Sequence, residues 1–240
     1  MANSFVTAAK KVLKTEADAL GKLKDDLPSD FSDLVKLILN LTGRVIVSGV
    51  GKSGHIGNKI AATLASTGTP AYFVHATEAS HGDLGMITEQ DLCLLISNSG
   101  ETIEMFDILT HARRFSIPIA TMSSNCESTL VKAANFKLCL PMVDEACPIG
   151  MAPTTSTTMM LALGDALAVA LMEAKSFNAE NFKVFHPGGK LGAKLMTVSQ
   201  LMHKDDTMPL VKTETSMKET LLTMSTKGFG IAAIVDEIGS

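Results

Sequence analysis

Apolar residues recur at helical spacing along the N-terminal part of the chain. This spacing predicts two helices, over Asn3–Lys24 and Asp30–Leu41, with a break at Pro28. The pattern then changes to short apolar runs that alternate with amphipathic segments. The expected strands are Arg44–Val47, Ala71–Val74, Asp91–Ser97, Ile117–Met122 and Phe136–Leu140, and the expected helices are His55–Thr67, Thr102–Phe115, Ser128–Ala134 and Pro153–Lys175.

Strands that alternate with helices predict an α/β fold. We expect a three-layer sandwich around a five-stranded parallel sheet with right-handed crossovers. The run Asp91–Ser97 is almost wholly apolar, which is typical of a parallel strand that helices cover on both faces. Ligands of such folds bind at the carboxyl ends of the strands, so the site is expected in the loops that follow them.

The C-terminal segment has a different rhythm. Leu201–Ser240 is predicted to form an extended piece, a helix and the strand Ile231–Val235, which is a small and incomplete α+β module. The predicted organisation is therefore N-terminal helices over 1–41, an α/β domain over 42–200 and the incomplete module over 201–240.

Composition narrows the class of partner. The chain is 46% hydrophobic with a formal net charge of −4, and it has no Trp, one Tyr and no run of Lys and Arg. These features argue against nucleic acid and favour a small molecule. The apolar stretch Met159–Met172 is shorter than the roughly 20 residues of a membrane span and contains Asp165, so we expect a buried helix and no membrane partner.

The four cysteines form no CxxC pair, and three of them lie in or beside apolar runs. The N-terminus is amphipathic and contains acidic residues, unlike a signal peptide. We therefore expect a reduced, cytoplasmic protein without a disulfide framework.

The loop after the first strand, SGVGKSG, matches parts of two nucleotide motifs. A P-loop requires a glycine five residues before Gly51, where this chain has Ile46, so that motif fails. A dinucleotide site requires an acidic residue at the end of the next strand, which ends in His75, with Glu78 a little beyond. The dinucleotide interpretation is the weaker one but stays open.

A monophosphate explains the same loop better. Glycine lets backbone N–H groups approach an anion, Ser48 and Ser53 add hydroxyls, and Lys52 adds a positive charge. A lone match of this kind is more often a plain turn with a solvated lysine. The monophosphate interpretation is favoured here because the loops after other predicted strands carry similar residues.

The third strand is followed by SNSGET, which places the hydroxyls of Ser97, Ser99 and Thr102 at a helix N-terminus. Ser123 and Ser124 follow the fourth strand. Glu104 lies in the first helical turn after SNSGET, where a carboxylate is favoured by the helix dipole. Beside an anion site it could also act as the base that moves a proton between two carbons of a sugar phosphate.

These segments resemble the sugar isomerase (SIS) domain family. Within it, VSGVGKSGHIGNKIAATLASTGTPAYFVHATEASHGDLGMI, ISNSGET, PIGMAPTTSTTMMLALGDALAVALM and FHPGGKLG are similar to the D-arabinose 5-phosphate isomerases. The C-terminal segment is similar to the first half of a CBS domain, and the second CBS unit of such a pair is missing from the sequence. That departure puts a regulatory role of this segment in doubt.

The resemblance implies a cytoplasmic aldose–ketose isomerase that interconverts D-ribulose 5-phosphate and D-arabinose 5-phosphate without a cofactor. It would supply 3-deoxy-D-manno-octulosonate for lipopolysaccharide or capsule. The resemblance also implies a homo-oligomer, expected to be a tetramer, in which subunits share the residues of each site. The implied catalytic residues are Lys52, His81, Glu104, Glu145 and His186. The implied substrate-binding residues are Ser48, Gly49, Ser53, His55, Gly68, Thr69, His75, Ser97, Ser99, Thr102, Ser123, Ser124, Pro141, Met142 and Val143.

Roles follow from the chemistry of such a reaction. Glu104 is expected to be the base, with Glu145 as the alternative base or as a residue that orients Lys52 or a histidine. Lys52 would stabilise the enediolate oxygen. His81 and His186 would move protons or hold hydroxyls, with His186 reaching a neighbouring subunit. His75 is also expected as an inhibitory transition-metal contact that catalysis does not require.

Two other functions fit parts of the pattern. A sugar-phosphate-binding regulator uses the same domain, but its usual DNA-binding helices ahead of the domain have no counterpart in the mixed-charge N-terminal segment. An isomerase for a different phosphosugar would keep the same loops. An amino-sugar enzyme would need a site for ammonia or an amide, and the sequence offers no motif for one.

Overall fold

The computed structural model describes residues 2–186 and 198–236. The chain divides into two compact units, Met1–Pro187 and Gly188–Ser240, which we describe separately. The predicted division into 1–41, 42–200 and 201–240 stays a prediction.

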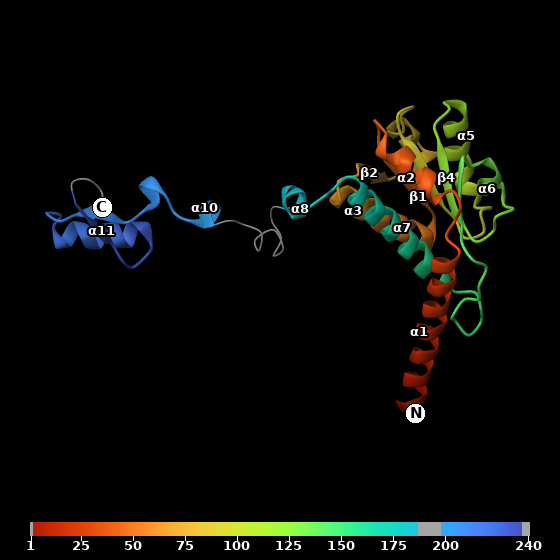
Figure 1. Ribbon diagram of the computed structural model, residues 1–240, viewed down its shortest axis with the longest axis horizontal. Coiled ribbons are helices and arrows are strands. Elements are labelled where there is room, and N and C mark those ends of the chain that lie inside the picture. Colours follow the sequence, from red (N-terminus) through yellow and green to blue (C-terminus); the bar gives the residue numbers. More distant parts are fainter. Residues whose placement is uncertain (1, 187–197, 237–240) are drawn as a thin grey trace. The chain divides into compact units, whose positions relative to one another are not determined.

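The first unit contains a sheet of five parallel strands in the order β2-β1-β3-β4-β5. Figure 1 shows this sheet between the helices, with β1, β2 and β4 labelled. The strands are β1 Val45–Gly49, β2 Ala71–Phe73, β3 Leu92–Ile96, β4 Ile119–Ser123 and β5 Phe136–Cys139. All five strands of the sequence prediction are present, and every neighbouring pair is parallel. The predicted α/β sandwich around a five-stranded parallel sheet is confirmed.

Helices cover both faces of this sheet. The helices of the first unit are α1 Ala2–Asp25, α2 Phe31–Leu39, α3 Gly51–Ser66, α4 Ala76–Ala79, α5 Phe106–Arg114, α6 Thr129–Ala133, α7 Thr155–Ala174 and α8 Ala179–Phe185. In β1, Val45 and Val47 pack in the core that includes α3 and α7, whereas Ile46 packs in the core that includes α5. The three layers therefore follow from strands that are apolar on both faces.

α7 is the apolar helix that composition alone left ambiguous. It is long and apolar enough to cross a membrane, and half of its most apolar window is buried inside the domain. Its buried residues, among them Met160, Leu163, Leu167 and Leu171, recur every three or four positions. Gly164 lets it approach α3 so closely that an added Cβ would lie 2.4 Å from Ile60. α7 is a core helix of the folded domain, as the sequence predicted.

The boundaries of several elements differ from expectation. α3 begins at Gly51 rather than His55, so Lys52 and Ser53 belong to its first turn. The 3₁₀ helix η2, Ile103–Met105, precedes α5, so the expected helix over Thr102–Phe115 is split in two. The short helix α4, the 3₁₀ helix η1 (Asp83–Met86) and α8 were not predicted, because each is too short to show a clear apolar period.

The second unit is a small α/β arrangement in its described part. It contains α10 Val198–Leu201, the 3₁₀ helix η3 Asp205–Thr207, β6 Leu210–Lys212, α11 Met217–Lys227 and β7 Ala233–Val235. β6 and β7 pair in parallel, and α11 lies between them in the chain. A capping box formed by Ser216 and Glu219 caps the N-terminus of α11. The predicted order of extended segment, helix and strand is present. The likeness to half a CBS domain stays a prediction.

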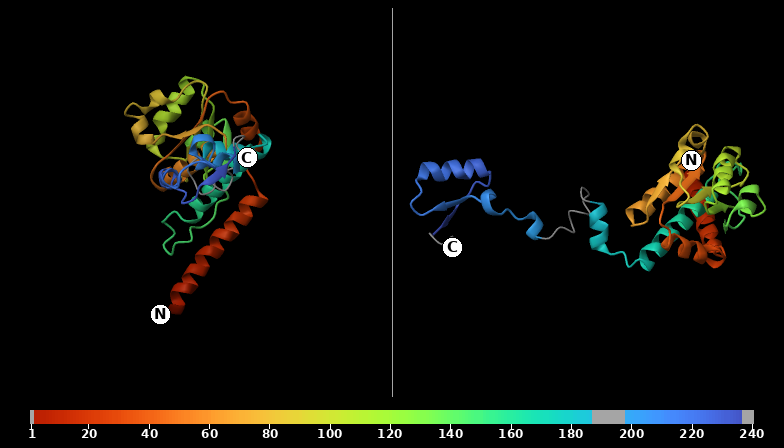
Figure 2. Two further views of the ribbon diagram at one scale, coloured as in Figure 1. Left: turned by 90° about the vertical axis from the view of Figure 1, so that its left-hand side faces the viewer. Right: turned by 90° about the horizontal axis from the view of Figure 1, so that it is seen from above.

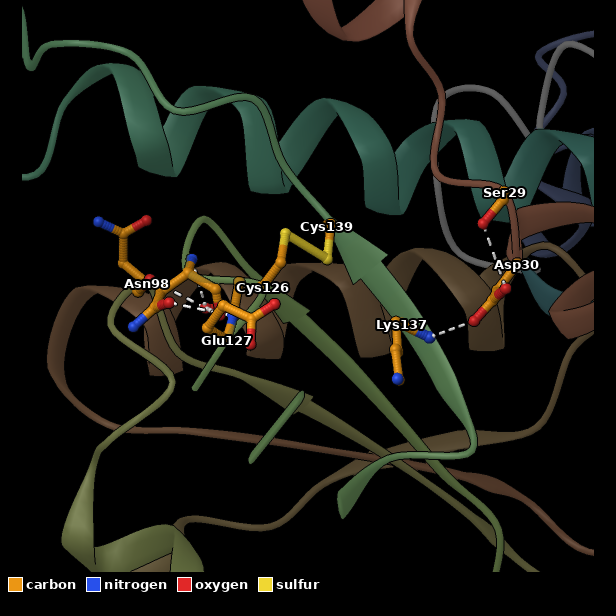
Figure 3. Close-up of a disulfide and its surroundings, with 9 residues drawn as sticks. Ser29, Asp30, Asn98, Cys126, Glu127, Lys137 and Cys139 are labelled. Atoms are coloured by element: carbon orange, nitrogen blue, oxygen red, sulfur yellow. Dashed lines mark hydrogen bonds between the residues drawn. A yellow bond between two sulfur atoms is a disulfide. The ribbon is translucent and has the colours of Figure 1, made fainter. Parts of the chain in front are cut away.

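One expectation about the cysteines is wrong. Cys126 and Cys139 form a disulfide, with their Cα atoms 5.6 Å apart (Figure 3). β4 and β5 are parallel neighbours with Ser123 opposite Cys139, so the chain that leaves β4 turns back over the end of β5. Spacing along the sequence cannot reveal this juxtaposition, because it depends on the register of two strands. Cys93 and Cys147 are free.

Candidate active site

The carboxyl ends of β1 and β3 lie side by side, and this is where the strand order reverses. The chain leaves β1 toward β2 on one side and later leaves β3 toward β4 on the other. Ligands of open α/β sheets bind at such a switch point. The Ser48–Gly54 and Ser97–Thr102 loops of the sequence prediction both lie there.

Glycine makes the first of these loops possible. A Cβ at Gly49 would lie 3.0 Å from the backbone of Ser53, and a Cβ at Gly54 would lie 2.9 Å from the carbonyl oxygen of Gly49. The end of β1 and the first turn of α3 therefore approach more closely than side chains allow. Ser48 is fully buried beside Met105, with Oγ 4.0 Å from Sδ, and so fixes the loop rather than lining it.

The first turn of α3 presents polar groups at the switch point. Its N-cap residue is Val50, whose side chain cannot accept a hydrogen bond from the first amides of the helix. Lys52 and His55 are exposed and Ser53 is half-buried. An uncapped helix N-terminus with a lysine in its first turn is suited to bind an anion.

The loop after β3 is held in shape by its own hydroxyls. Ser97 Oγ lies 2.7 Å from Thr102 Oγ1 and accepts a hydrogen bond of 3.0 Å from the backbone N–H of Gly100. Ser97 is buried, whereas Ser99 is exposed and accepts a hydrogen bond of 3.2 Å from Glu101 N–H. Of the three hydroxyls predicted to bind phosphate, Ser99 and the half-buried Thr102 are therefore the ones that a ligand can reach.

A second loop braces the first one. Ser123 Oγ donates to the backbone carbonyl of Asn98 over 3.0 Å, and Ser124 Oγ donates to Asn98 Oδ1 over 2.8 Å. Ser123 is fully buried, and Ser124 is half-buried. The structure thus brings together the predicted serines after β3 and β4. Sequence reasoning missed Asn98, although it stands between Ser97 and Ser99 in the loop that was singled out.

Glu101 connects the same loop to the next helix. Its Oε1 accepts a hydrogen bond of 2.7 Å from the N–H of Thr129, the first residue of α6. This hydrogen bond lowers the pKa of the Glu101 carboxyl, with a smaller contribution from the charge of Lys132. Glu101 was also missed, and the signal for it would have been a carboxylate able to reach a helix N-terminus.

Glu104 lies beside the carboxyl end of β1. It is exposed in η2, and its neighbour Met105 is fully buried against Ser48. The contact between Met105 and Ser48 therefore places η2 at the end of β1, and the carboxylate of Glu104 is exposed there. Among the described residues, the ion pairs leave out both Lys52 and Glu104.

Glu145 has a different environment. Its Oε2 accepts hydrogen bonds from Thr154 N–H at 2.7 Å and Thr154 Oγ1 at 3.0 Å, and its carboxylate also accepts from the backbone and hydroxyl of Ser156. Burial alone would raise the pKa of Glu145, but these hydrogen bonds outweigh it, so the pKa lies below its ordinary value. Glu145 is an ionised cap at the N-terminus of α7, a poor environment for a base that must accept a proton.

The two loop histidines after β2 lie near the same edge. His75 follows β2 and caps α4, with Nδ1 accepting a hydrogen bond of 3.3 Å from Thr77 N–H. His81 is exposed just after α4. Within the described residues, His, Cys, Asp and Glu side chains form no cluster of three that could hold a metal ion. The metal contact of His75 stays a prediction.

Three of the predicted site residues, Gly68, Thr69 and His186, do not lie at the carboxyl ends of the strands in the same chain. Gly68 and Thr69 precede β2, and both accept hydrogen bonds from Lys175 at the end of α7. His186 follows α8, where its ring stacks on Phe182 and its Nδ1 lies 2.9 Å from the Phe182 carbonyl oxygen. A single chain therefore does not bring these three residues to Lys52. The continuation of the FHPGGKLG segment beyond His186 lies outside the described residues.

The loop after β5 faces α1. Pro141, Met142 and Val143 lead from β5 toward Glu145, with Met142 exposed. Met142 and Val143 line one side of a 510 Å³ cleft whose other side is α1, with Asp18 and Lys22 among its residues. The structure places this loop beside the last strand of the sheet rather than at the switch point.

Comparison with known proteins agrees with this architecture. Residues 38–170 match the SIS domain family. Arabinose 5-phosphate isomerase KdsD from Yersinia pestis is 50% identical over 97% of this chain and 71% of its own length, and the same-named protein of Pseudomonas aeruginosa is 48% identical over 98% and 72%. The solved structure of E. coli CFT073 c3406 in complex with arabinose 5-phosphate has a TM-score of 0.75 and 39% identity, covering 77% of this chain and 98% of that one. The chain belongs to the SIS domain family and, within it, to the family of the arabinose 5-phosphate isomerases.

Proposed function

We propose that this chain interconverts D-arabinose 5-phosphate and D-ribulose 5-phosphate by an enediol proton transfer. The observation that carries the proposal is the convergence of the hydroxyl-bearing loops after β1, β3 and β4 at one edge of the sheet, with an exposed lysine and an exposed glutamate beside them. Relatives near 50% identity carry the name of this activity.

In this proposal the loops around Asn98 bind the phosphate. Ser99, Thr102 and Ser124 offer hydroxyls that a ligand can reach, while Ser97 shapes the loop after β3 and Ser123 joins it to the loop after β4. The uncapped amides at the start of α3 add further donors. Because substrate and product share the same phosphate, its binding orients the reacting carbons without favouring either sugar.

Proton transfer falls to Glu104. As a carboxylate it removes the proton from C2 of the aldose, which gives an enediolate, and it returns the proton to C1 to give the ketose. Lys52 stabilises the negative charge on the enediolate oxygen, and His81 exchanges protons between the two oxygens. Glu145 is a positioning residue, because the hydrogen bonds at the α7 N-terminus keep it ionised.

A complete site requires a second subunit in this proposal. Gly68, Thr69 and His186 lie at the other end of the sheet from Lys52, so a neighbouring chain must supply them if they contact substrate. The surface offers contacts for such an assembly. The N-terminal half of α1 projects beyond the sheet (Figure 2). Phe5 in this half is 73% exposed, and an apolar groove of 320 Å³ lies between α1 and α7. We propose a homotetramer.

The cellular setting follows from the family. The protein is proposed to act in the cytoplasm and to supply 3-deoxy-D-manno-octulosonate for lipopolysaccharide or capsule.

The second unit is proposed to be the first half of a CBS domain. Its β6-α11-β7 order supports this assignment.

A direct assay tests the proposal. The 240-residue protein is mixed with D-arabinose 5-phosphate in the presence of EDTA, and formation of the ketose is followed. We expect turnover with EDTA present and none with D-glucose 6-phosphate, which has the same phosphate on a longer sugar. A folded protein that binds D-arabinose 5-phosphate without converting it would favour a sugar-phosphate-binding module instead.

A further inference from the structure

The disulfide joins a loop to the end of a strand at the carboxyl edge of the sheet. Cys126 lies in the segment between β4 and α6, and Cys139 is the last residue of β5. Figure 3 shows the bridge between the β4–α6 segment, which also contacts Asn98, and the end of β5. The bridge therefore fixes the β4–α6 segment from the side opposite to the β3 loop.

Both half-cystines stand two residues from predicted site residues. Cys126 follows Ser124, whose hydroxyl donates to Asn98 Oδ1 over 2.8 Å. Cys139 precedes Pro141, where the loop toward Glu145 begins. With the disulfide closed, the segment is held by Asn98 on one side and by β5 on the other. With it open, the ends of the segment stay held, by the hydrogen bond from Leu140 N–H to the Ser123 carbonyl and by that from Lys132 N–H to the Ser128 carbonyl. Between these ends, the contacts that remain are the hydrogen bonds to Asn98, those within the segment and the exposed ion pair of Glu127 with Lys132.

The four cysteines differ in access to small reagents. Cys126 is exposed and Cys139 is half-buried, so a small thiol can reach the bridge. Cys93 is fully buried in β3, and burial raises the pKa of its thiol to about 12, which makes it unreactive. Cys147 is half-buried in the loop before α7, where it accepts hydrogen bonds from Met151 and Ala152 N–H.

We propose that Cys126 and Cys139 form a reversible thiol–disulfide modification site that controls the order of residues 123–128 and thereby the affinity for the sugar phosphate. The reagents are a low-molecular-weight thiol and its disulfide. On reduction a thiolate attacks one sulfur of the bridge, which forms a mixed disulfide and releases the other cysteine as a thiolate. A second thiolate then attacks the mixed disulfide and releases the low-molecular-weight disulfide. The protein gains two electrons and its two thiolates take up two protons, and oxidation reverses each step.

The effect on catalysis is expected in binding rather than turnover. The tethered segment carries Ser124, whereas Lys52 lies in the first turn of α3 and Glu104 lies in η2. Opening the bridge should therefore raise KM for D-arabinose 5-phosphate by roughly three- to tenfold and change kcat by less than about twofold, the pattern of a loss of uniform binding. This kinetic part rests on the proposed isomerase function.

The experiment compares the protein treated with excess dithiol with the protein equilibrated with a low-molecular-weight disulfide. Thiol titration after unfolding should count four thiols in the first form and two in the second, because Cys93 and Cys147 are free in both. Amide hydrogen exchange over residues 123–128 should be faster in the reduced form, and KM should be higher. Cys126→Ser should show the reduced behaviour under both treatments, and Cys147→Ser should respond like the wild type.

Each contrary result has a distinct meaning. Four thiols in both forms, or equal exchange of residues 123–128 in both forms, overturns the proposed site. Slower exchange in the oxidised form with equal KM overturns its control of affinity. Absence of isomerisation in both forms would reject the proposed function, while the thiol count and the exchange rates would still decide whether the site exists.

Discussion

Ser124 donates a hydrogen bond of 2.8 Å from its hydroxyl to Oδ1 of Asn98, and this contact ties the loop after β4 to the loop after β3. The same asparagine accepts a hydrogen bond from Ser123 through its backbone carbonyl. Asn98 therefore organises two loops whose serines were predicted separately from sequence. The loops of the candidate site act as one unit, and changes in either should affect phosphate binding.

Removal of the Ser124 hydroxyl should weaken substrate binding. Ser124→Ala deletes the donor to Asn98 and one accessible hydroxyl, so we expect KM to rise by roughly three- to tenfold with little change in kcat. A neutral hydrogen bond contributes about 0.5–1.5 kcal/mol, so the protein should remain folded. Steady-state kinetics with D-arabinose 5-phosphate measure the effect. Ser116→Ala, at an exposed serine between α5 and β4, is the control, and a Ser124→Ala enzyme with wild-type KM would contradict the role.

Neutralising Glu104 should abolish proton transfer without unfolding the protein. Glu104→Gln keeps the size of an exposed side chain, so the free energy of unfolding should change by less than about 0.5 kcal/mol. Loss of a general base should lower kcat by about 10²–10⁴-fold. Asp107→Asn removes an exposed carboxylate one turn later, in the first turn of α5, and should retain activity. Near-normal turnover in Glu104→Gln would move the base to another carboxylate.

Lys52 should affect the transition state more than the fold. Lys52→Ala removes an exposed cation from the first turn of α3, so we expect the melting temperature to stay nearly constant and kcat to fall by roughly 10²–10³-fold, as for other groups that stabilise a developing oxyanion. Lys59→Ala is the matched control, because Lys59 belongs to the same helix but pairs with Asp165 of α7. A Lys52→Ala enzyme that retains kcat and loses only affinity would assign the lysine to the phosphate instead.

The pattern of apolar runs was sufficient to locate the five strands. The central strands β1, β3 and β4 are buried along their whole length, and a strand covered on both faces is mostly apolar. The edge strands β2 and β5 are only partly buried but were still recognised. The start of α3 was placed four residues too late, since its first turn is glycine-rich and polar where a helix is normally recognised by apolar spacing. These polar residues belong to the candidate site and do not pack in the core. For this reason the start of α3 was predicted wrongly at the candidate site itself.

Some features of the site depend on contacts that no local pattern encodes. The partnership of Asn98 with Ser124 and the bridge between Cys126 and Cys139 both arise because β3, β4 and β5 are adjacent in register. The sequence placed Ser97 and Ser123 correctly at strand ends, but only burial separates them, as loop-shaping residues, from the accessible Ser99. The alternation of strands and helices was enough to predict that the serine-bearing loops lie at one edge of the sheet, but not which of the serines are exposed.

The hydrogen bonds of Glu145 predict a pH dependence of stability. Its pKa is lower in the folded chain than its ordinary value of 4.5, so the unfolded state binds its proton more readily. The stabilisation is therefore present at neutral pH and is lost as the pH falls from about 4.5 toward the folded-state pKa. Urea unfolding of the wild type and of Glu145→Gln should show a difference at pH 7 that shrinks below pH about 4.5. An equal difference at both pH values would contradict the role of the carboxylate charge.

Gly100 should be far less tolerant of a side chain than another glycine with the same backbone conformation. Its φ is 65°, and an added Cβ would lie 1.9 Å from Oγ of Ser128, a buried hydroxyl without a hydrogen-bond partner among the described residues. Gly150 has a φ of 66° but no atom within 4 Å of an added Cβ. Both alanine variants carry the cost of a left-handed residue, about 1–2 kcal/mol, and only Gly100→Ala adds a collision in the loop after β3.

Chemical unfolding should therefore show a larger loss of unfolding free energy for Gly100→Ala, accompanied by a higher KM, whereas Gly150→Ala should keep its KM. Replacing Ser128 by glycine in the Gly100→Ala background should restore part of the lost stability, because it removes the colliding atoms. Equal losses in the two single variants would mean that Ser128 moves aside and that the packing of Gly100 against it does not shape the site.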